Sequence, residues 1–119
     1  MIDQVALTAV RALQCQSQPD IVARLLSQYL ETSVDIVNTI RSAVRLKNAT
    51  ELRAAAHRLK SSSAQLGAST LAADCRELEM MGVSQELGGA EEVLSKLERH
   101  YAAVCAAFQE ELAKGRSAT

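Results

Sequence analysis

One histidine of this sequence lies among residues that could support nucleophilic chemistry. His57 is followed by Lys60, and small side chains at Ala54, Ser61 and Ala64 occupy neighbouring positions on the same face of a helix. Small neighbours leave the ring open to an incoming group, and the lysine places a cation near any anion bonded to the ring. An imidazole with one nitrogen held by a hydrogen bond can use the other as a nucleophile. The pattern therefore predicts a reactive, exposed imidazole.

Glu79 is expected to supply that hydrogen bond. The helix that carries His57 and the helix that follows meet at a tight turn near Ala68, so they should pack antiparallel. In such a hairpin, positions whose numbers sum to about 136 or 137 lie level. This rule pairs Leu59 with Leu78, apolar with apolar, and it sets Glu79 level with His57.

Length and composition bound the fold. The chain has 119 residues, which suits one domain, and 48% of them are hydrophobic while only 3% are aromatic. A core made of Leu, Val, Ile and Ala is typical of a helix bundle. We therefore predict one domain over residues 1–119 of the all-α class, an antiparallel four-helix bundle with a short extra N-terminal helix.

Hydrophobic spacing and breakers place the helices. The expected segments are 2–13, 20–46, a third that begins near Ala49, 70–81 and 90–113. Pro19 suits a first helical turn, and Asn48 suits an N-cap with Glu51 reaching back to it. Leu52, Leu59 and Leu66 should line the buried face of the third helix.

Glycines and the chain end predict the remaining boundaries. Gly67 should stop the third helix, and Ser69 should cap the fourth. The segment GVSQELGG, which begins at Gly82, should be a loop, and residues from about 114 to 119 should be a disordered tail.

Several function classes are disfavoured. The formal net charge is −1, which gives no field for nucleic acid. Cys15, Cys75 and Cys105 lack metal or disulfide spacing and are read as buried reduced thiols. There is no Glu-x-x-His pair for a bundle metal site, no Gly-rich phosphate loop for ATP, and no apolar run long enough to span a membrane.

The stretch AHRLKSSSAQLGASTLAADCRELE, residues 56–79, resembles the histidine-containing phosphotransfer (Hpt) domain of bacterial multistep phosphorelays. It matches an A-H-x-L-K-[G/S] start, an L-G-A turn and a C-x-x-L-E helix. The resemblance implies that His57 is the phosphoacceptor, that Lys60 stabilises the phosphoryl charge and that Glu79 orients the imidazole. Ser61 stands where many members have Gly, as a small residue near the site, and Gly67 matches the glycine of the turn.

The implied function is a relay of a phosphoryl group between Asp residues of receiver domains. Partners would be response-regulator receiver domains and an upstream hybrid sensor kinase, and the receiver would supply Mg²⁺, so the chain needs no cofactor of its own. We expect a phosphoryl carrier without kinase activity, a monomer that contacts neither nucleic acid nor membrane, and a cytoplasmic location. It could be a free protein or the cytoplasmic C-terminal part of a membrane-bound hybrid kinase.

Other readings remain open at the level of sequence. A lone helical histidine with Arg and Lys as neighbours also suits an ordinary solvated helix face. The chain could be a non-catalytic helical protein–protein interaction module, or the serines at 61–63 could be the phosphorylated groups. Basic residues that could steer an acidic partner toward His57 are Arg41, Arg45, Lys47, Arg53, Arg58 and Lys60.

Overall fold

The computed structural model describes residues 19–117, which form four α-helices and no strand. The helices are α2 (Pro19–Leu46), α3 (Ala49–Gln65), α4 (Ser69–Ser84) and α5 (Ala90–Ser117). The prediction of an all-α four-helix bundle is confirmed, and Pro19 begins α2 as expected. The predicted extra helix over 2–13 and Cys15 lie outside the described residues.

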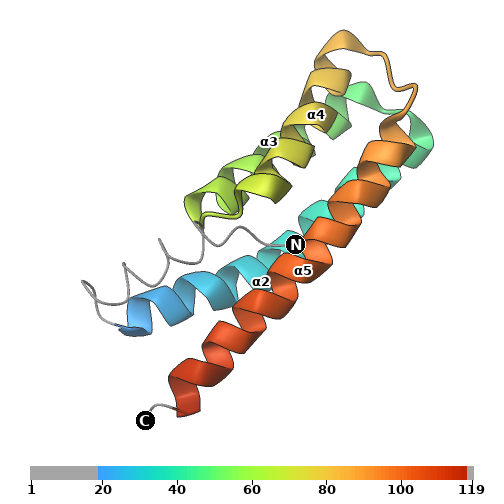
Figure 1. Ribbon diagram of the computed structural model, residues 1–119. Coiled ribbons are helices and arrows are strands. Elements are labelled where there is room, and N and C mark those ends of the chain that lie inside the picture. The colour runs from blue at the N-terminus through green and yellow to red at the C-terminus, as the bar shows by residue number, and fades with distance from the viewer. Residues whose placement is uncertain (1–18, 118–119) are drawn as a thin grey trace.

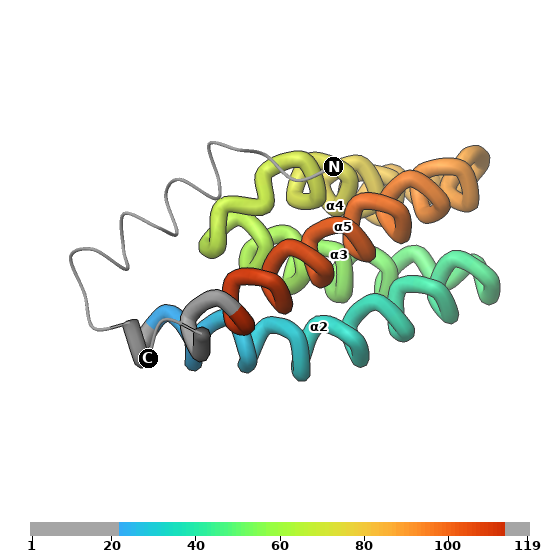
Figure 2. Tube along the Cα trace, turned by 60° about the horizontal axis from the view of Figure 1, so that its bottom comes forward, coloured from blue at the N-terminus to red at the C-terminus, as the bar shows by residue number. Residues whose placement is uncertain are grey.

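The bundle consists of two long helices and a shorter hairpin. Helices α2 and α5 have 28 residues each, whereas α3 has 17 and α4 has 16. Figure 1 shows α3 and α4 side by side over one half of the bundle, while α2 and α5 continue past the α3–α4 turn. The second view, in Figure 2, shows α3 between α2 and α4. Helix α4 also packs against α5, so the hairpin contacts both long helices.

A tight turn joins α3 to α4. Gly67 adopts φ 80°, a left-handed conformation that glycine tolerates best. Its N–H donates to the Ala64 carbonyl at 3.0 Å, and the Ala68 N–H donates to the Ser63 carbonyl at 2.8 Å. This pair of bonds is a Schellman motif. The predicted stop at Gly67 is confirmed.

The start of α3 is capped as predicted, with one change. The Asn48 side-chain oxygen accepts a hydrogen bond from the Glu51 N–H at 3.1 Å. The Glu51 carboxylate accepts from the Asn48 side-chain amide at 3.3 Å instead of from its backbone N–H. That N–H is already used, because it donates to the Ala43 carbonyl at 2.9 Å.

Two predictions about α4 are wrong. The N-cap position belongs to Ala68, without a side-chain cap bond, and Ser69 is already helical, because the Schellman turn leads directly into the next helix. The helix also continues to Ser84, where Gln85 caps it in the left-handed conformation, so Gly82 is not in a loop. Gly82 is buried against α3, and this close approach explains a glycine inside a helix.

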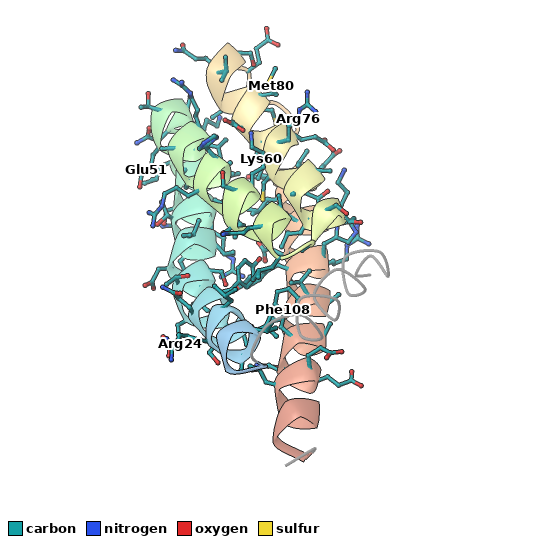
Figure 3. The ribbon with its side chains drawn as sticks, turned by 90° about the vertical axis from the view of Figure 1, so that its left-hand side faces the viewer. Arg24, Glu51, Lys60, Arg76, Met80 and Phe108 are labelled. Atoms are coloured by element: carbon teal, nitrogen blue, oxygen red, sulfur yellow. The ribbon has the colours of Figure 1, made fainter. Side chains whose placement is uncertain are left out.

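The core is aliphatic along its length. Leu52, Leu59 and Leu66 are buried as predicted. The largest fully buried side chains of the described residues are Phe108, Leu26, Ile40, Leu52, Leu59, Leu71, Leu78, Leu97, Val37 and Val104. Figure 3 shows Phe108 between α2 and α5.

Two hydroxyl pairs cross this core. Tyr29 contacts Phe108 edge to face, with ring centroids 5.5 Å apart, and its hydroxyl pairs with that of Ser63 at 2.9 Å. The hydroxyls of Ser33 and Tyr101 lie 2.7 Å apart. Burial raises the pKa of Tyr29 and raises that of Tyr101 to about 12. Both phenols therefore stay protonated and act as hydrogen-bonding groups that tie α2 to α3 and to α5.

Helix α5 continues to Ser117, four residues beyond the predicted end at Ala113. Residues 118 and 119, the end of the predicted tail, lie outside the described residues.

Substituting Gly82→Ala should lower the free energy of unfolding. An added Cβ would lie 2.8 Å from both the Ala49 carbonyl oxygen and the Arg53 Cβ. Overpacking of this kind costs about 1–3 kcal/mol, which should exceed the roughly 1 kcal/mol that alanine gains in helix propensity. Gly88→Ala is the control, because a Cβ there meets nothing within 4 Å. Urea unfolding of both variants tests this, and an unchanged or raised stability of Gly82→Ala contradicts it.

Candidate functional site

The hairpin brings His57 and Glu79 into contact. The imidazole Nδ1 lies 2.8 Å from Glu79 Oε2, with His57 on α3 and Glu79 on α4. Beneath them Leu59 and Leu78 are both fully buried. The register predicted for the hairpin is therefore confirmed, and the carboxylate holds the tautomer that carries the proton on Nδ1.

Lys60 binds the other oxygen of the Glu79 carboxylate. Its Nζ donates to Glu79 Oε1 at 2.5 Å, so each oxygen of Glu79 binds one basic side chain of α3. Figure 3 shows Lys60 between α3 and α4. The sequence predicted Lys60 near the ring but did not predict its bond to Glu79.

The imidazole is open to solvent. The side chain of His57 is 58% exposed, whereas that of Glu79 is 17% exposed. A hollow on one side of the ring is lined by Thr50, Arg53, Ala54, Arg58 and Glu79. Another, on the side of α2, is lined by Thr32, Ile36, Arg58, Ser61, Ser62 and Gln65. A group that approaches His57 can thus reach it from the surface without displacing core residues.

Ser61 and Gly67 have different roles in this geometry. Ser61 is exposed and borders the hollow beside His57, as predicted for a small neighbour. Gly67 lies ten residues after His57, about 15 Å along a helix axis, so its contribution is to the turn. It fixes the register that sets Glu79 opposite the ring.

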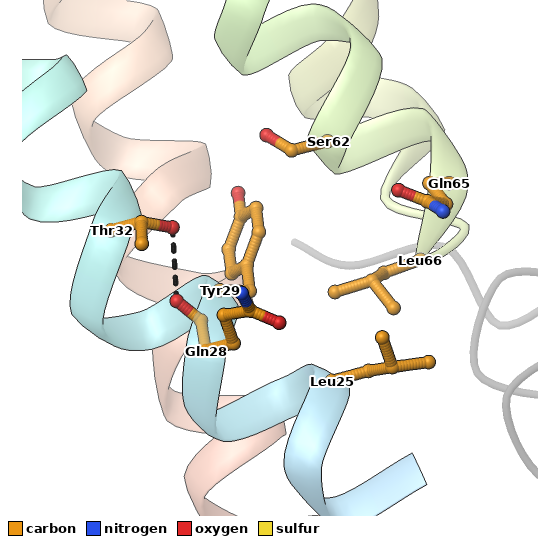
Figure 4. Close-up of a pocket in the computed structure, with 7 residues that line it drawn as sticks. All are labelled: Leu25, Gln28, Tyr29, Thr32, Ser62, Gln65 and Leu66. Carbon is orange, nitrogen blue, oxygen red and sulfur yellow. Dashed lines mark hydrogen bonds between the residues drawn. The ribbon is translucent and has the colours of Figure 1, made fainter. Parts of the chain in front are cut away.

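The serines after Ser61 are held by the fold. Ser62 donates to the Arg58 carbonyl at 3.1 Å, and the buried Ser63 pairs with Tyr29. A further hollow begins beside Ser62 and continues along Leu25, Gln28, Tyr29, Thr32, Gln65 and Leu66 (Figure 4).

Hydrogen bonds stabilise the charged form of Glu79. The bond from Lys60 lowers the pKa of this carboxyl below its ordinary value of 4.5, and the bond with His57 adds to the effect, while desolvation partly opposes it. Glu79 is therefore an anion at neutral pH, which is the form that accepts both hydrogen bonds.

The predicted basic residues do not form a single cluster. Arg53 and Arg58 border the hollow next to His57. Arg41 instead binds Glu98 of α5 at 3.3 Å, because the α2 face that carries it packs toward α5. Arg45 and Lys47 are exposed near the α2–α3 turn.

Sequence reasoning missed a second histidine cluster. His100 Nδ1 lies 2.5 Å from Oδ2 of the buried Asp74, and Lys96 lies 3.7 Å from Oδ1 of the same carboxylate. The available signal was weak: Lys96 and His100 are four residues apart on one helix face, but no tight turn fixes how α5 lies against α4.

The two cysteines of the described chain form neither a disulfide nor part of a metal-binding group. Cys75 and Cys105 are free, and burial raises the pKa of the Cys75 thiol to about 12. Cys75 is fully buried as predicted, whereas Cys105 is partly exposed. No group of three or more His, Cys, Asp or Glu residues suited to a metal occurs among the residues described, and none of their helices is long and apolar enough to cross a membrane.

Comparison with known proteins identifies the class. The family model of the Hpt domain matches residues 24–113, so the chain belongs to the Hpt family of histidine-containing phosphotransfer domains. The chain is also similar to histidine-containing phosphotransfer protein B (HptB) from Pseudomonas aeruginosa PAO1. The two share 27% sequence identity and a TM-score of 0.83 over 95% of each chain. A search of curated proteins found no match. The chain is therefore a histidine phosphotransfer domain of phosphorelay signalling. Members of this family are phosphocarriers and not kinases.

Glu79→Gln should change how stability depends on pH. The pKa of Glu79 is lower in the folded chain than in the unfolded chain, so the ionised carboxylate stabilises the fold at any pH above its unfolded pKa. This stabilisation is lost as the pH falls through the folded pKa, because the carboxylate then takes up a proton. The native protein should therefore exceed Glu79→Gln in free energy of unfolding at pH 7, and the difference should shrink as pH falls below about 4.5. Urea unfolding between pH 7 and 3 measures it. Glu86→Gln, which removes an exposed carboxylate, is the control, and a difference independent of pH contradicts the assignment.

Proposed function

We propose that His57 is the phosphoacceptor of this domain and that Nε2 is the reacting atom. The contact between His57 Nδ1 and Glu79 Oε2 carries the proposal, because it leaves Nε2 as the nitrogen with a free lone pair. The 58% exposure of the His57 side chain supports access by another protein domain.

The transfer exchanges a bond between phosphorus and oxygen for a bond between phosphorus and nitrogen. The Nε2 lone pair attacks the phosphorus of an aspartyl phosphate, the bond between phosphorus and the carboxylate oxygen breaks, and the carboxylate leaves without needing a proton. The Nδ1 proton stays in its hydrogen bond with Glu79, which stabilises the charge that develops on the ring. Reversal of these steps passes the phosphoryl group to a second Asp. In-line geometry and charge stabilisation are what such a transfer requires.

Lys60 is proposed to stabilise the transferred group. It lies one helical turn after His57 and binds Glu79, which in turn binds the ring. An ammonium group has three N–H donors, so Lys60 can keep Glu79 and still donate to a phosphoryl oxygen. Its cation also offsets the negative charge of Glu79 next to an incoming phosphate.

The proposed partners follow from what this site lacks. Among the described residues the site combines an oriented imidazole with Lys60, Arg53 and Arg58 and includes no phosphate loop, and we infer that the chain neither binds nor uses ATP. The phosphoryl group would come from the receiver domain of a hybrid sensor kinase and go to a response-regulator receiver, with Mg²⁺ supplied by the receiver. Arg53 and Arg58 beside the ring suit an acidic pocket. We propose that the domain acts as a monomer in the cytoplasm.

Substituting His57→Gln should abolish transfer of radiolabel from a phosphorylated receiver domain. The native chain should carry acid-labile label, as expected for a P–N bond. His100→Gln is the matched control and should accept label from the receiver as the native chain does. Label that survives acid would assign the serines, and no label from any receiver of a panel would favour an interaction module without phosphotransfer.

Lys60→Gln should slow the same transfer roughly tenfold, which corresponds to about 1.4 kcal/mol of lost charge stabilisation. Lys60→Arg should keep most of the rate, because it keeps the cation. Single-turnover transfer measured by rapid quench separates the variants. If Lys60→Gln transfers at the native rate, Lys60 only holds Glu79 and does not act on the phosphoryl group.

A further inference from the structure

Helix α4 carries a second carboxylate that binds a histidine. Asp74 Oδ2 lies 2.5 Å from His100 Nδ1 of α5, and Lys96 Nζ lies 3.7 Å from Asp74 Oδ1. The atoms correspond to those around His57, where one oxygen of Glu79 binds the ring and the other binds Lys60. In both clusters a carboxylate of α4 holds Nδ1 and a lysine lies on its other oxygen.

The two clusters lie on different sides of α4. Asp74 and Glu79 are five residues apart, which is about 140° around a helix and about 7.5 Å along it. Glu79 therefore faces α3 while Asp74 faces α5, as their partners show. A phosphoryl group on the His57 ring would therefore leave the His100 ring free to react.

The local environment of His100 restricts what can reach it. Its side chain is 23% exposed, compared with 58% for His57, and that of Asp74 is 5% exposed. A side chain with this lower exposure is less accessible to a folded domain than to a small phosphoryl donor. Lys96 lies at the edge with a side chain 37% exposed, and it also binds Glu77 at 2.9 Å.

We propose that His100 is a second phosphoryl acceptor, which reacts at Nε2 with small phosphoryl donors of the phosphoramidate type and not with receiver domains. Asp74 holds the Nδ1 proton and so leaves the Nε2 lone pair free. Lys96 supplies a cation for the phosphoryl oxygens. Asp74 and Glu77 oppose an approaching anion, so the reaction is slower than at His57.

The step balances without another reactant. At neutral pH the phosphoramidate nitrogen is already protonated. The Nε2 lone pair forms the new bond to phosphorus, the P–N bond of phosphoramidate breaks, and ammonia leaves with the bonding pair. The Nδ1 proton remains between the ring and Asp74.

The test uses the full chain with His57→Gln, so that only the second site is measured. Incubation with phosphoramidate should give acid-labile phosphate on His57→Gln, more slowly than on the native chain, and none on the double variant His57→Gln/His100→Gln. Phosphate is read by intact mass before and after an acid wash. Circular dichroism melting establishes that each variant is folded.

Two results would overturn the proposal. One is the absence of label on folded His57→Gln under conditions that label the native chain. The other is label that persists on the double variant, because it would lie elsewhere. Neither depends on receiver transfer, so this site and the role proposed for His57 succeed or fail separately.

Asp74→Asn in the His57→Gln background tests the positioning residue. If Asp74 only tied α4 to α5, its loss would lower melting temperature without changing the ring atom that reacts. If Asp74 holds Nδ1, phosphorus–nitrogen NMR couplings should show phosphate on Nε2 alone when Asp74 is present. In the Asp74→Asn variant they should show a mixture of Nδ1 and Nε2 phosphate, or no phosphate.

Discussion

The close packing of α4 on α3 is the constraint on which the site depends. The Schellman turn at Gly67 fixes how far α3 runs before the chain reverses. Leu59 and Leu78 bury fully against the core, and Gly82 allows the backbones to approach at the far end of the hairpin. With the pair held at both ends, Glu79 has one place to lie, and this place is opposite His57.

This constraint explains how a bundle with few polar core groups can present an exposed imidazole in a fixed orientation. The orientation of His57 does not depend on burial of its ring. The fold leaves His57 on the surface and places the carboxylate of Glu79 against Nδ1, and the bond from Lys60 lowers the pKa of this carboxyl further. Such an arrangement demands little of the rest of the fold, and the long helices α2 and α5 serve mainly to bury the inner face of the hairpin.

The sequence predicted this part of the site well because short connections leave little freedom. The three-residue connection between α3 and α4 fixes the register, so the position of the turn and the pairing of Leu59 with Leu78 set Glu79 level with His57. The link between α4 and α5 is longer, and sequence periodicity could not reveal that Asp74 lies against His100. The loop predicted to begin at Gly82 was wrong for a different reason: glycine usually breaks helices, and only the close approach of α3 explains a glycine inside α4. Likewise, the spacing of Lys60 from His57 could not show that both bind the same carboxylate.

The ring nitrogen that carries phosphorus is the most direct test of the account, because it reports the hydrogen bond between His57 and Glu79 and not just the presence of a histidine. The chain labelled with ¹⁵N-histidine, phosphorylated by a receiver domain, would show its phosphorus–nitrogen couplings by NMR. The account predicts phosphate on Nε2 of His57, with Nδ1 still protonated. Phosphate on Nδ1 would contradict it, since that atom could not then remain bound to Glu79.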